Sequence, residues 1–441
     1  LIKVNQGDTL LKKLLNGPID LPAVVLHVSR HSRKGSQGFG RVHGNARVMI
    51  LTEPMWAIPF WLFNTYATIY MRALGLSEPQ VGLVVSLASA SSMVFGVVSG
   101  HVVDRMGRRK ACLVFDLLSW SIPTLIWALA RDFWHFVFAA LMNGLVGIAA
   151  PAFQCLLVED APPQDRLPIF TALQVAVILP GLLVPFAGLL VGRMGIAAGV
   201  RLFYFFGFIS MTTMFFLRYY LTTESRVGME RMVATSSHRL RDSLSDYFKA
   251  MRLLLRNHAA LVIITVNILF FFRDSVAISM QQIYIVEALK ISPAFLGMLP
   301  LISSCVQLAI LFLVVSRIGG YNEQKSLIRG LIFSMAGSLL FVVAPVGSLV
   351  MVLLSTAFTA AGTGFAMPAI NAGLNNAIGD GERSELLAIS FILLSLARMS
   401  GAASAGFLYT LKPVLPFITS LGLIIFGFLI YVVCGLSHTK R

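Results

Sequence analysis

Three charged side chains lie in the interior of long apolar stretches of this chain. Arg273 and Asp274 fall near the middle of the apolar segment 259–285, and Arg398 falls in the middle of the segment 384–410. A charge at the centre of a membrane costs about 2.5–3.5 kcal/mol on insertion scales, so such groups normally face a cavity or a partner. A carboxylate in that setting can exchange a proton or bind a cation, whereas an arginine can hold an anion.

These charges have two interpretations that the sequence leaves open. In the first, Asp274 is a proton- or cation-coupling carboxylate, and Arg398 or Arg273 anchors an anionic ligand. In the second, a salt bridge between Asp274 and an arginine holds the helices in one arrangement. Adjacent residues of a helix point about 100° apart, so Arg273 and Asp274 cannot both line one narrow stripe. We therefore expect one to face a cavity and the other to contact a neighbouring helix.

The elements that must position these groups are apolar helices. Of the 441 residues 57% are hydrophobic and only 12% are charged, and the mean hydropathy is +0.80. Soluble domains carry about 25% charged residues, so a soluble globular protein is excluded. A helix that crosses a membrane needs about 20 apolar residues. Twelve segments meet this requirement and predict an all-α polytopic membrane protein: 50–72, 79–102, 111–130, 133–157, 167–192, 200–221, 259–285, 293–316, 326–346, 348–371, 384–410 and 413–436.

The basic charge follows the loops. The net charge is +15, and most of the 35 lysines and arginines fall in the two termini and in alternate loops. This is the distribution that places basic loops on the cytoplasmic side of a membrane. We therefore expect a multi-pass protein of the plasma (inner) membrane with both termini cytoplasmic. The charge sets topology, and nucleic acid is not an expected partner.

The segments divide the chain into two halves. Residues 1–48 are predicted to be a disordered basic tail or, alternatively, an extension that does not belong to the natural protein. Residues 49–221 and 259–437 each hold six apolar segments. The stretch 222–258 is predicted to be a cytoplasmic loop whose second half forms an amphipathic helix at the membrane surface.

The two halves repeat each other. ALGLSEPQVG at residues 73–82 corresponds to ALKISPAFLG at residues 288–297, with an offset of 215 positions. The two segments occupy equivalent places in their halves, which makes an internal duplication credible.

A glycine- and arginine-rich turn follows the second apolar segment. It reads Gly100-His-Val-Val-Asp104-Arg-Met-Gly107-Arg108-Arg-Lys110. Gly100 is expected to let the helix end pack closely against a neighbour, and Gly107 to permit a tight turn. Asp104 can accept hydrogen bonds from arginines or from the amides of a helix start.

This turn resembles the G-x-x-x-D-R-x-G-R-R-K signature of the major facilitator superfamily. The resemblance covers the chain from residue 50 onward and implies two pseudo-symmetric six-helix bundles that work by alternating access. Glu159 to Arg166 is similar to the acidic-to-arginine loop of that family, which forms part of a cytoplasmic gate. The gate implied here consists of Gly100, Asp104, Arg105, Gly107, Arg108, Arg109, Glu159 and Arg166.

The resemblance also implies a central cavity that includes the first segment. Asn64 lies near its middle and Trp61 belongs to its aromatic cluster, and Gln281 is a further polar candidate in the seventh segment. For each of these residues, hydrogen bonding between helices is the alternative to substrate contact.

Two departures from the family pattern bear on function. A motif frequent in proton-coupled members starts with arginine, where this chain has Ala140 four residues before Gly144. The fifth-segment motif of drug:proton antiporters is matched only loosely, around Pro180 and Gly181.

The aromatic first segment and the loose fifth-segment likeness favour H⁺-coupled export of a small amphipathic compound. Two interior arginines against one acid favour the alternative, a carrier for an organic anion or metabolite. A third hypothesis is a membrane sensor or accessory subunit that transports nothing. We expect a monomer whose partners are a small-molecule substrate and the lipid bilayer.

Enzyme chemistry finds no support in the sequence. No phosphate-binding P-loop or zinc-spaced histidine pair is present, so no cofactor is expected beyond H⁺ as the coupling ion. The four cysteines lie in apolar segments without metal-ligand spacing. We therefore predict that the chain is not an enzyme and holds no metal.

Overall fold

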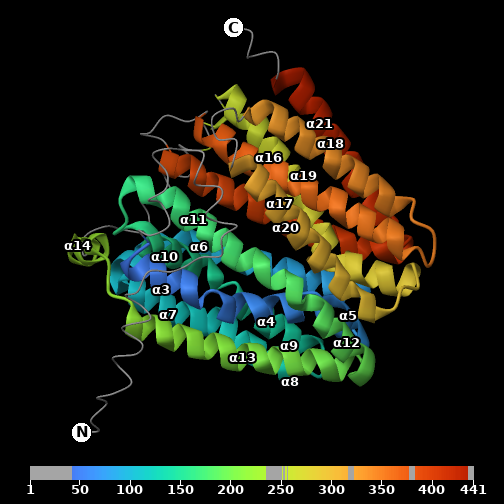
Figure 1. The fold of residues 1–441 in the computed structure, drawn as a ribbon, viewed down its shortest axis with the longest axis horizontal. Coiled ribbons are helices and arrows are strands. Elements are labelled where there is room, and N and C mark those ends of the chain that lie inside the picture. The colour runs from blue at the N-terminus through green and yellow to red at the C-terminus, as the bar shows by residue number, and fades with distance from the viewer. Residues whose placement is uncertain are drawn as a thin grey trace.

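The fold consists of two helical bundles that lie against each other (Figure 1). The computed structural model describes residues 42–234, 257–315, 322–376 and 383–435, together with residues 251, 254 and 255. Most of the predicted basic tail and most of the predicted amphipathic helix lie outside these residues.

The N-terminal bundle, blue to green in Figure 1, holds the elements from α3 to α13. Short π-helical or 3₁₀ turns, labelled η, continue several of its helices. Its elements are α3 (Gly44–Thr52), α4 (Pro54–Asn64), α5 (Ala67–Ala73), α6 (Glu78–Met106), α7 (Arg108–Asp116), η2 (Leu117–Ser121), α8 (Ile122–Leu129), α9 (Phe133–Asn143), α10 (Val146–Val158), α11 (Pro163–Ile178), η3 (Leu179–Leu183), α12 (Val184–Met194) and α13 (Ile196–Leu221).

The C-terminal bundle, yellow to red, starts after the connecting helix α14 (Arg226–Ala234). Its elements are α16 (His258–Ile283), η4 (Tyr284–Ala288), η5 (Pro293–Gly297), α17 (Met298–Val315), α18 (Glu323–Val342), α19 (Leu349–Asn376), α20 (Arg383–Leu411), α21 (Leu415–Ile430) and η7 (Tyr431–Gly435).

Eleven helical segments of the described residues are long and apolar enough to cross a membrane. The one remaining predicted span is the first in chain order. It is broken into α3, α4 and α5, which follow one another along the bundle in Figure 1. Pro54 begins α4 and Pro59 lies inside it. Proline lacks a backbone N–H and clashes with the preceding turn, which interrupts a continuous helix. The predicted all-α fold of two six-span bundles is confirmed, and α3 starts at Gly44, before the predicted bundle boundary at residue 49.

The two bundles meet along two helix pairs. The long helix α6 packs along α20, and α12 packs against η5 at the start of α17. We call the end of the molecule that carries residues 100–110 the motif end, and the opposite end the far end.

Candidate functional site

The bundles enclose a central cavity made of two neighbouring chambers. The larger chamber, of about 410 Å³, is lined mainly by helices of the C-terminal bundle. The other, of about 350 Å³, is lined mainly by the N-terminal bundle. Phe60, Asn64 and Ile278 line both chambers and so form the boundary between them. Volumes of this size are typical of sites for small molecules.

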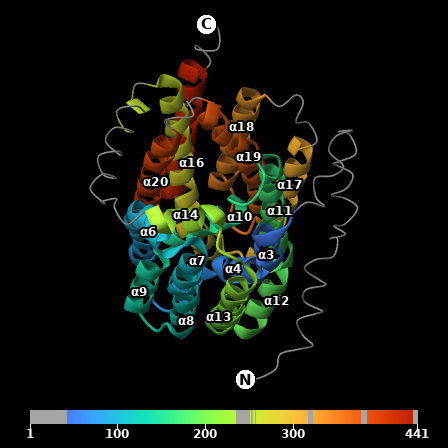
Figure 2. The same ribbon diagram turned by 90° about the vertical axis from the view of Figure 1, so that its left-hand side faces the viewer.

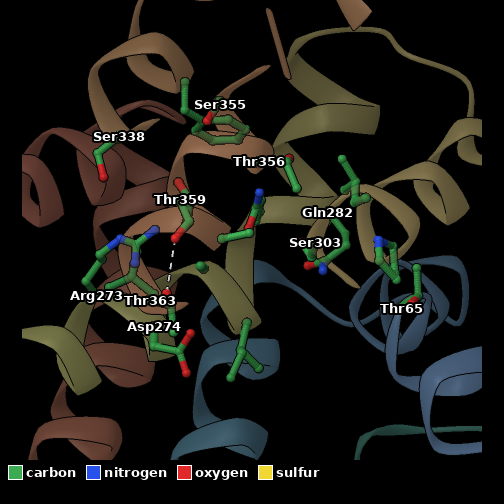
Figure 3. Close-up of a pocket in the computed structure, with 18 of the residues that line it drawn as sticks. Thr65, Arg273, Asp274, Gln282, Ser303, Ser338, Ser355, Thr356, Thr359 and Thr363 are labelled. Atoms are coloured by element: carbon green, nitrogen blue, oxygen red, sulfur yellow. Dashed lines mark hydrogen bonds between the residues drawn. The ribbon is translucent and has the colours of Figure 1, made fainter. Parts of the chain in front are cut away.

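The C-terminal chamber holds Arg273 and Asp274, which point in different directions from α16 (Figure 3). The carboxylate of Asp274 is exposed to the chamber, whereas Arg273 is buried at 7% exposure. This agrees with the expectation that the two adjacent residues point in different directions, with one of them facing a cavity. Among the described residues, Asp274 forms no salt bridge with either arginine, although its charge acts on both Arg273 and Arg398.

The remaining predicted candidates of the first and seventh segments also line this chamber. Trp61, Asn64 and Gln281 lie on its wall, next to Phe60. The indole Nε1 of Trp61 donates a hydrogen bond to the carbonyl oxygen of Val177, at 2.8 Å. Trp61 therefore makes the predicted alternative contact, between helices, while its ring borders the chamber.

A row of hydroxyl side chains lines the C-terminal chamber and was not predicted from the sequence. Ser355, Thr359 and Thr363 of α19 line the C-terminal chamber, and Ser303 faces them from α17 (Figure 3). Their spacing of four residues places the three α19 positions on one face of the helix. That spacing was visible in the sequence and could have identified them.

The N-terminal chamber is aromatic and receives Arg398. Among its lining residues are the large rings of Phe60, Trp120, Trp127 and Tyr204. Arg398 lines it from the opposite bundle, exposed to the chamber, with its guanidinium 4.4 Å from the ring centre of Phe271. A guanidinium in such a position keeps its donors available for an anion.

The predicted gate residues gather around Arg108 at the motif end. The buried guanidinium of Arg108 pairs with Asp104 at 2.8 Å and with Glu159 at 3.2 Å. Gly107 has a φ of +83° and forms the tight turn between α6 and α7, as expected. Arg105 and Arg166 are exposed and, among the described residues, join no salt bridge.

Gly100 does not pack as predicted. A Cβ built on Gly100 would meet no described atom within 4 Å, so no described residue makes the close approach expected there. The glycine lies on an exposed part of α6, away from the α6–α7 turn. The close packing predicted at Gly100 is therefore not made by any described residue.

Glu224, which the sequence reasoning missed, completes this network from the segment before α14. Its two carboxylate oxygens accept hydrogen bonds from the backbone N–H groups of Arg108, at 2.9 Å, and Arg109, at 3.0 Å. A carboxylate at a helix N-terminus is stabilised by the free amides and the helix dipole. Ser225 donates to Glu159, and Figure 2 shows α14 lying close to α6 and α7 at this end. No sequence pattern joined Glu224 to the motif.

A buried ion pair supports the N-terminal bundle behind the gate. Glu53 and Arg218 are both less than a tenth exposed, and their charged groups are 2.5 Å apart. Arg218 also donates to the hydroxyl of Thr52 and to the carbonyl oxygen of Met49. The pair thus ties the first span to α13.

At the far end the two bundles contact each other, in part through residues that the internal repeat relates. Arg72 and Glu287 are 215 positions apart, the same offset as the internal repeat, and they form a two-pronged salt bridge between the bundles at 2.9 and 3.3 Å. Gly82 approaches Ala402 and Gly406 of α20, so a Cβ at Gly82 would lie 2.6 Å from the Ala402 oxygen.

Gly297, the repeat partner of Gly82, makes the matching approach on the other side of the molecule. A Cβ there would lie 2.6 Å from the carbonyl oxygen of Val184, the first residue of α12. The two glycine approaches and the Arg72–Glu287 bridge therefore seal the same end.

Comparison with known proteins agrees with this architecture. The family model described as Major Facilitator Superfamily matches residues 55–273, from α4 to α16. The solved structure of the nucleoside transporter NupG superposes with a TM-score of 0.72 at 11% identity, and the match covers 89% of this chain and 100% of that chain. This likeness shows the fold. The chain belongs to the Major Facilitator Superfamily.

Curated members of the superfamily resemble the chain at low identity. Multidrug resistance protein 2 of Bacillus subtilis is 23% identical over 374 residues, which are 83% of this chain and 88% of that protein. Quinolone resistance protein NorA of Staphylococcus aureus is 22% identical over 99 residues, which are 22% of this chain and 25% of that protein. This superfamily member is a multi-pass membrane transporter.

Proposed function

We propose that this transporter exports a small amphipathic compound in exchange for protons, with Asp274 as the coupling carboxylate. The observation that carries the proposal is the position of Asp274. It is the acidic residue among those lining the two described chambers, it is exposed to its chamber, and it forms no salt bridge with a described residue. An acid so placed can exchange its proton with whichever side the cavity faces.

The coupling follows from competition at this carboxylate. When Asp274 is ionised it attracts a cationic or hydrogen-bonding group of the substrate, and when it is protonated it does not. Substrate and proton therefore exclude each other, and alternating access converts this exclusion into exchange in opposite directions. The aromatic chamber supplies the apolar contact area that an amphipathic compound needs. The names of the two relatives, which concern resistance to drugs, support export.

The orientation belongs to the same proposal. The distribution of basic loops supports an orientation with the motif end and both termini on the cytoplasmic side of the plasma membrane. The far end then faces outward, and the closure at Arg72 and Glu287 corresponds to a state that is shut to the outside. The proposal includes a monomer, which is supported by a cavity lined by residues of a single chain.

Flux in proteoliposomes tests the proposal. A pH gradient, acidic on the far side, is expected to drive export of a fluorescent amphipathic cation by the wild type. Asp274→Asn should retain downhill flux but lose its dependence on the gradient, while Glu230→Gln, an exposed substitution on α14, behaves as the wild type. Gradient-driven flux that persists unchanged in Asp274→Asn refutes the coupling role.

A carrier for an organic anion is the second candidate, because two arginines stand near a single acid. In such a carrier, protonation affects substrate binding in the opposite direction to that in the proposed exporter. Protonation of Asp274 removes a negative charge and strengthens anion binding, so proton and anion move in the same direction. Acidification should therefore tighten substrate binding for an anion carrier and weaken it for the exporter, which a binding titration at two pH values distinguishes.

A further inference from the structure

The two cavity-exposed charges lie in different chambers and have opposite signs. Asp274 is exposed to the hydroxyl-lined chamber of the C-terminal bundle, and Arg398 is exposed to the aromatic chamber of the N-terminal bundle. From this arrangement we infer that the substrate is an aromatic zwitterion, with its acidic group bound by Arg398 and its amino group bound by Asp274. The inference rests on the proposed function and specifies its substrate class.

The aromatic chamber determines where the body of the substrate lies. Trp120 packs edge-on against Phe60 at 5.8 Å, and Trp127 packs against Tyr204 at 5.2 Å, so this part of the wall is made of aromatic rings that pack on one another. Flat rings gain both area burial and ring contacts on such a wall. An aliphatic compound of equal size would gain only the former.

Arg398 is positioned for an anionic group at this wall. Its guanidinium lies over the ring of Phe271, and its own backbone oxygen accepts a hydrogen bond from Ser275 at 2.6 Å. The backbone is thus held against α16 while the side chain faces the chamber. Among the described residues the guanidinium has no salt-bridge partner, so a carboxylate of the substrate can bind it through two hydrogen bonds.

Arg273 does not offer a second anion site of the same kind. It is buried, and its side chain extends from α16 toward Thr359 and away from Asp274 (Figure 3). Arg273 also lines this chamber, but it is buried, so the exposed charges that a ligand meets are one negative and one positive group. A simple anion leaves Asp274 unmatched, and a simple cation leaves Arg398 unmatched.

The zwitterion also reconciles the arginine with proton exchange. The amino group competes with a proton for Asp274, which gives exchange in opposite directions, and the acidic group contributes affinity without taking part in that competition. A purely anionic substrate would instead bind together with the proton. The charge pattern and the direction of transport therefore agree for a compound that carries both groups.

Three matched probes test the inference. We use an aminomethyl-biphenyl-carboxylic acid with its charged groups at opposite ends, its methyl ester, which is a cation, and its N-acetyl derivative, which is an anion. Isothermal titration calorimetry with the purified protein measures the three affinities. The zwitterion is expected to bind about tenfold more tightly than either derivative, because each derivative loses one charge-assisted contact and such a contact contributes about tenfold in affinity.

The variants assign each charge to its residue. Arg398→Gln should weaken the zwitterion and the anion about tenfold and leave the cation unchanged, whereas Arg398→Lys keeps the charge and should recover most of the affinity. Asp274→Asn should weaken the zwitterion and the cation but not the anion. Arg193→Gln, an exposed substitution on α12, serves as control, and gel filtration of each variant establishes that it is folded.

Several results overturn the inference. These are equal binding of the three probes, tighter binding of either singly charged probe, failure of the zwitterion to bind, or equal losses for all probes in Arg398→Gln. If the cation is exported by a pH gradient through Asp274 without preference for the zwitterion, the proposed function stands and this inference fails. If the zwitterion binds as described but no gradient drives its flux, proton coupling fails and the substrate class stands.

Discussion

The salt bridge between Arg72 and Glu287 is expected to stabilise the state closed at the far end, and Glu287→Gln tests this. The bridge crosses between the bundles, and Arg72 also pairs with Glu78 at 2.8 Å within its own bundle. When the bundles separate, only the contact with Glu287 is lost. The substitution therefore acts on the closed state and leaves the open state nearly unchanged.

The size of the effect follows from geometry and exposure. The bridge is two-pronged, which strengthens it, but the side chains of Arg72 and Glu287 are 25% and 37% exposed, so solvent screens it. We therefore expect the bridge to stabilise the closed state by about 1 kcal/mol. Its loss shifts the equilibrium between closed and open states about fivefold.

Spin labels on the two bundles measure this shift. Labels at Arg131 and Val346, both exposed at the far end, report the distance between the bundles by double electron–electron resonance, in a background with the four cysteines replaced by serine. Glu287→Gln should enlarge the long-distance population about fivefold. The double reversal Arg72→Glu with Glu287→Arg should restore part of the closed population. An unchanged distance distribution in Glu287→Gln would refute the reasoning.

Three other substitutions test separate parts of the structure. Gly82→Ala places a methyl group 2.6 Å from a facing carbonyl oxygen of α20, so the far end should stay open to spin labels, whereas Gly422→Ala, with nothing within 4 Å, should not change it. Glu224→Gln should lower stability by about 1 kcal/mol through loss of the charged cap of α7, seen as a lower Tm that exposed Glu230→Gln does not share. Glu53→Gln leaves a buried arginine without its carboxylate and should cost about 3 kcal/mol, seen as aggregation on gel filtration; a normal elution profile would contradict the buried pair.

Hydropathy predicted the spans because lipid demands about 20 apolar residues from each, whatever their identity. It did not predict the broken first span, since a hydropathy window counts the apolar proline carbons and ignores the missing N–H of Pro54. The depth of Asp274 and Arg398 was likewise readable from the sequence. Their separation into two chambers was not, because it depends on how α16 and α20 rotate against the opposite bundle.

The contacts between distant segments were the hardest to predict. The repeat aligned residues 73–82 with 288–297, and one step before it stand Arg72 and Glu287, of opposite charge. Only the fold shows that the two repeats meet at that point. Glu224 gave no signal at all, since its role depends on the loop after α13 returning to the start of α7.

Labelling of a single cysteine at the centre of the cavity tests alternating access most directly. In the cysteine-free background, Asp274→Cys is exposed to a membrane-impermeant maleimide, either in intact cells or in inside-out vesicles. Alternating access predicts labelling from both sides, with faster labelling from the outside when Gly82→Ala is added. Labelling from one side only, unaffected by Gly82→Ala, or from neither side would contradict it.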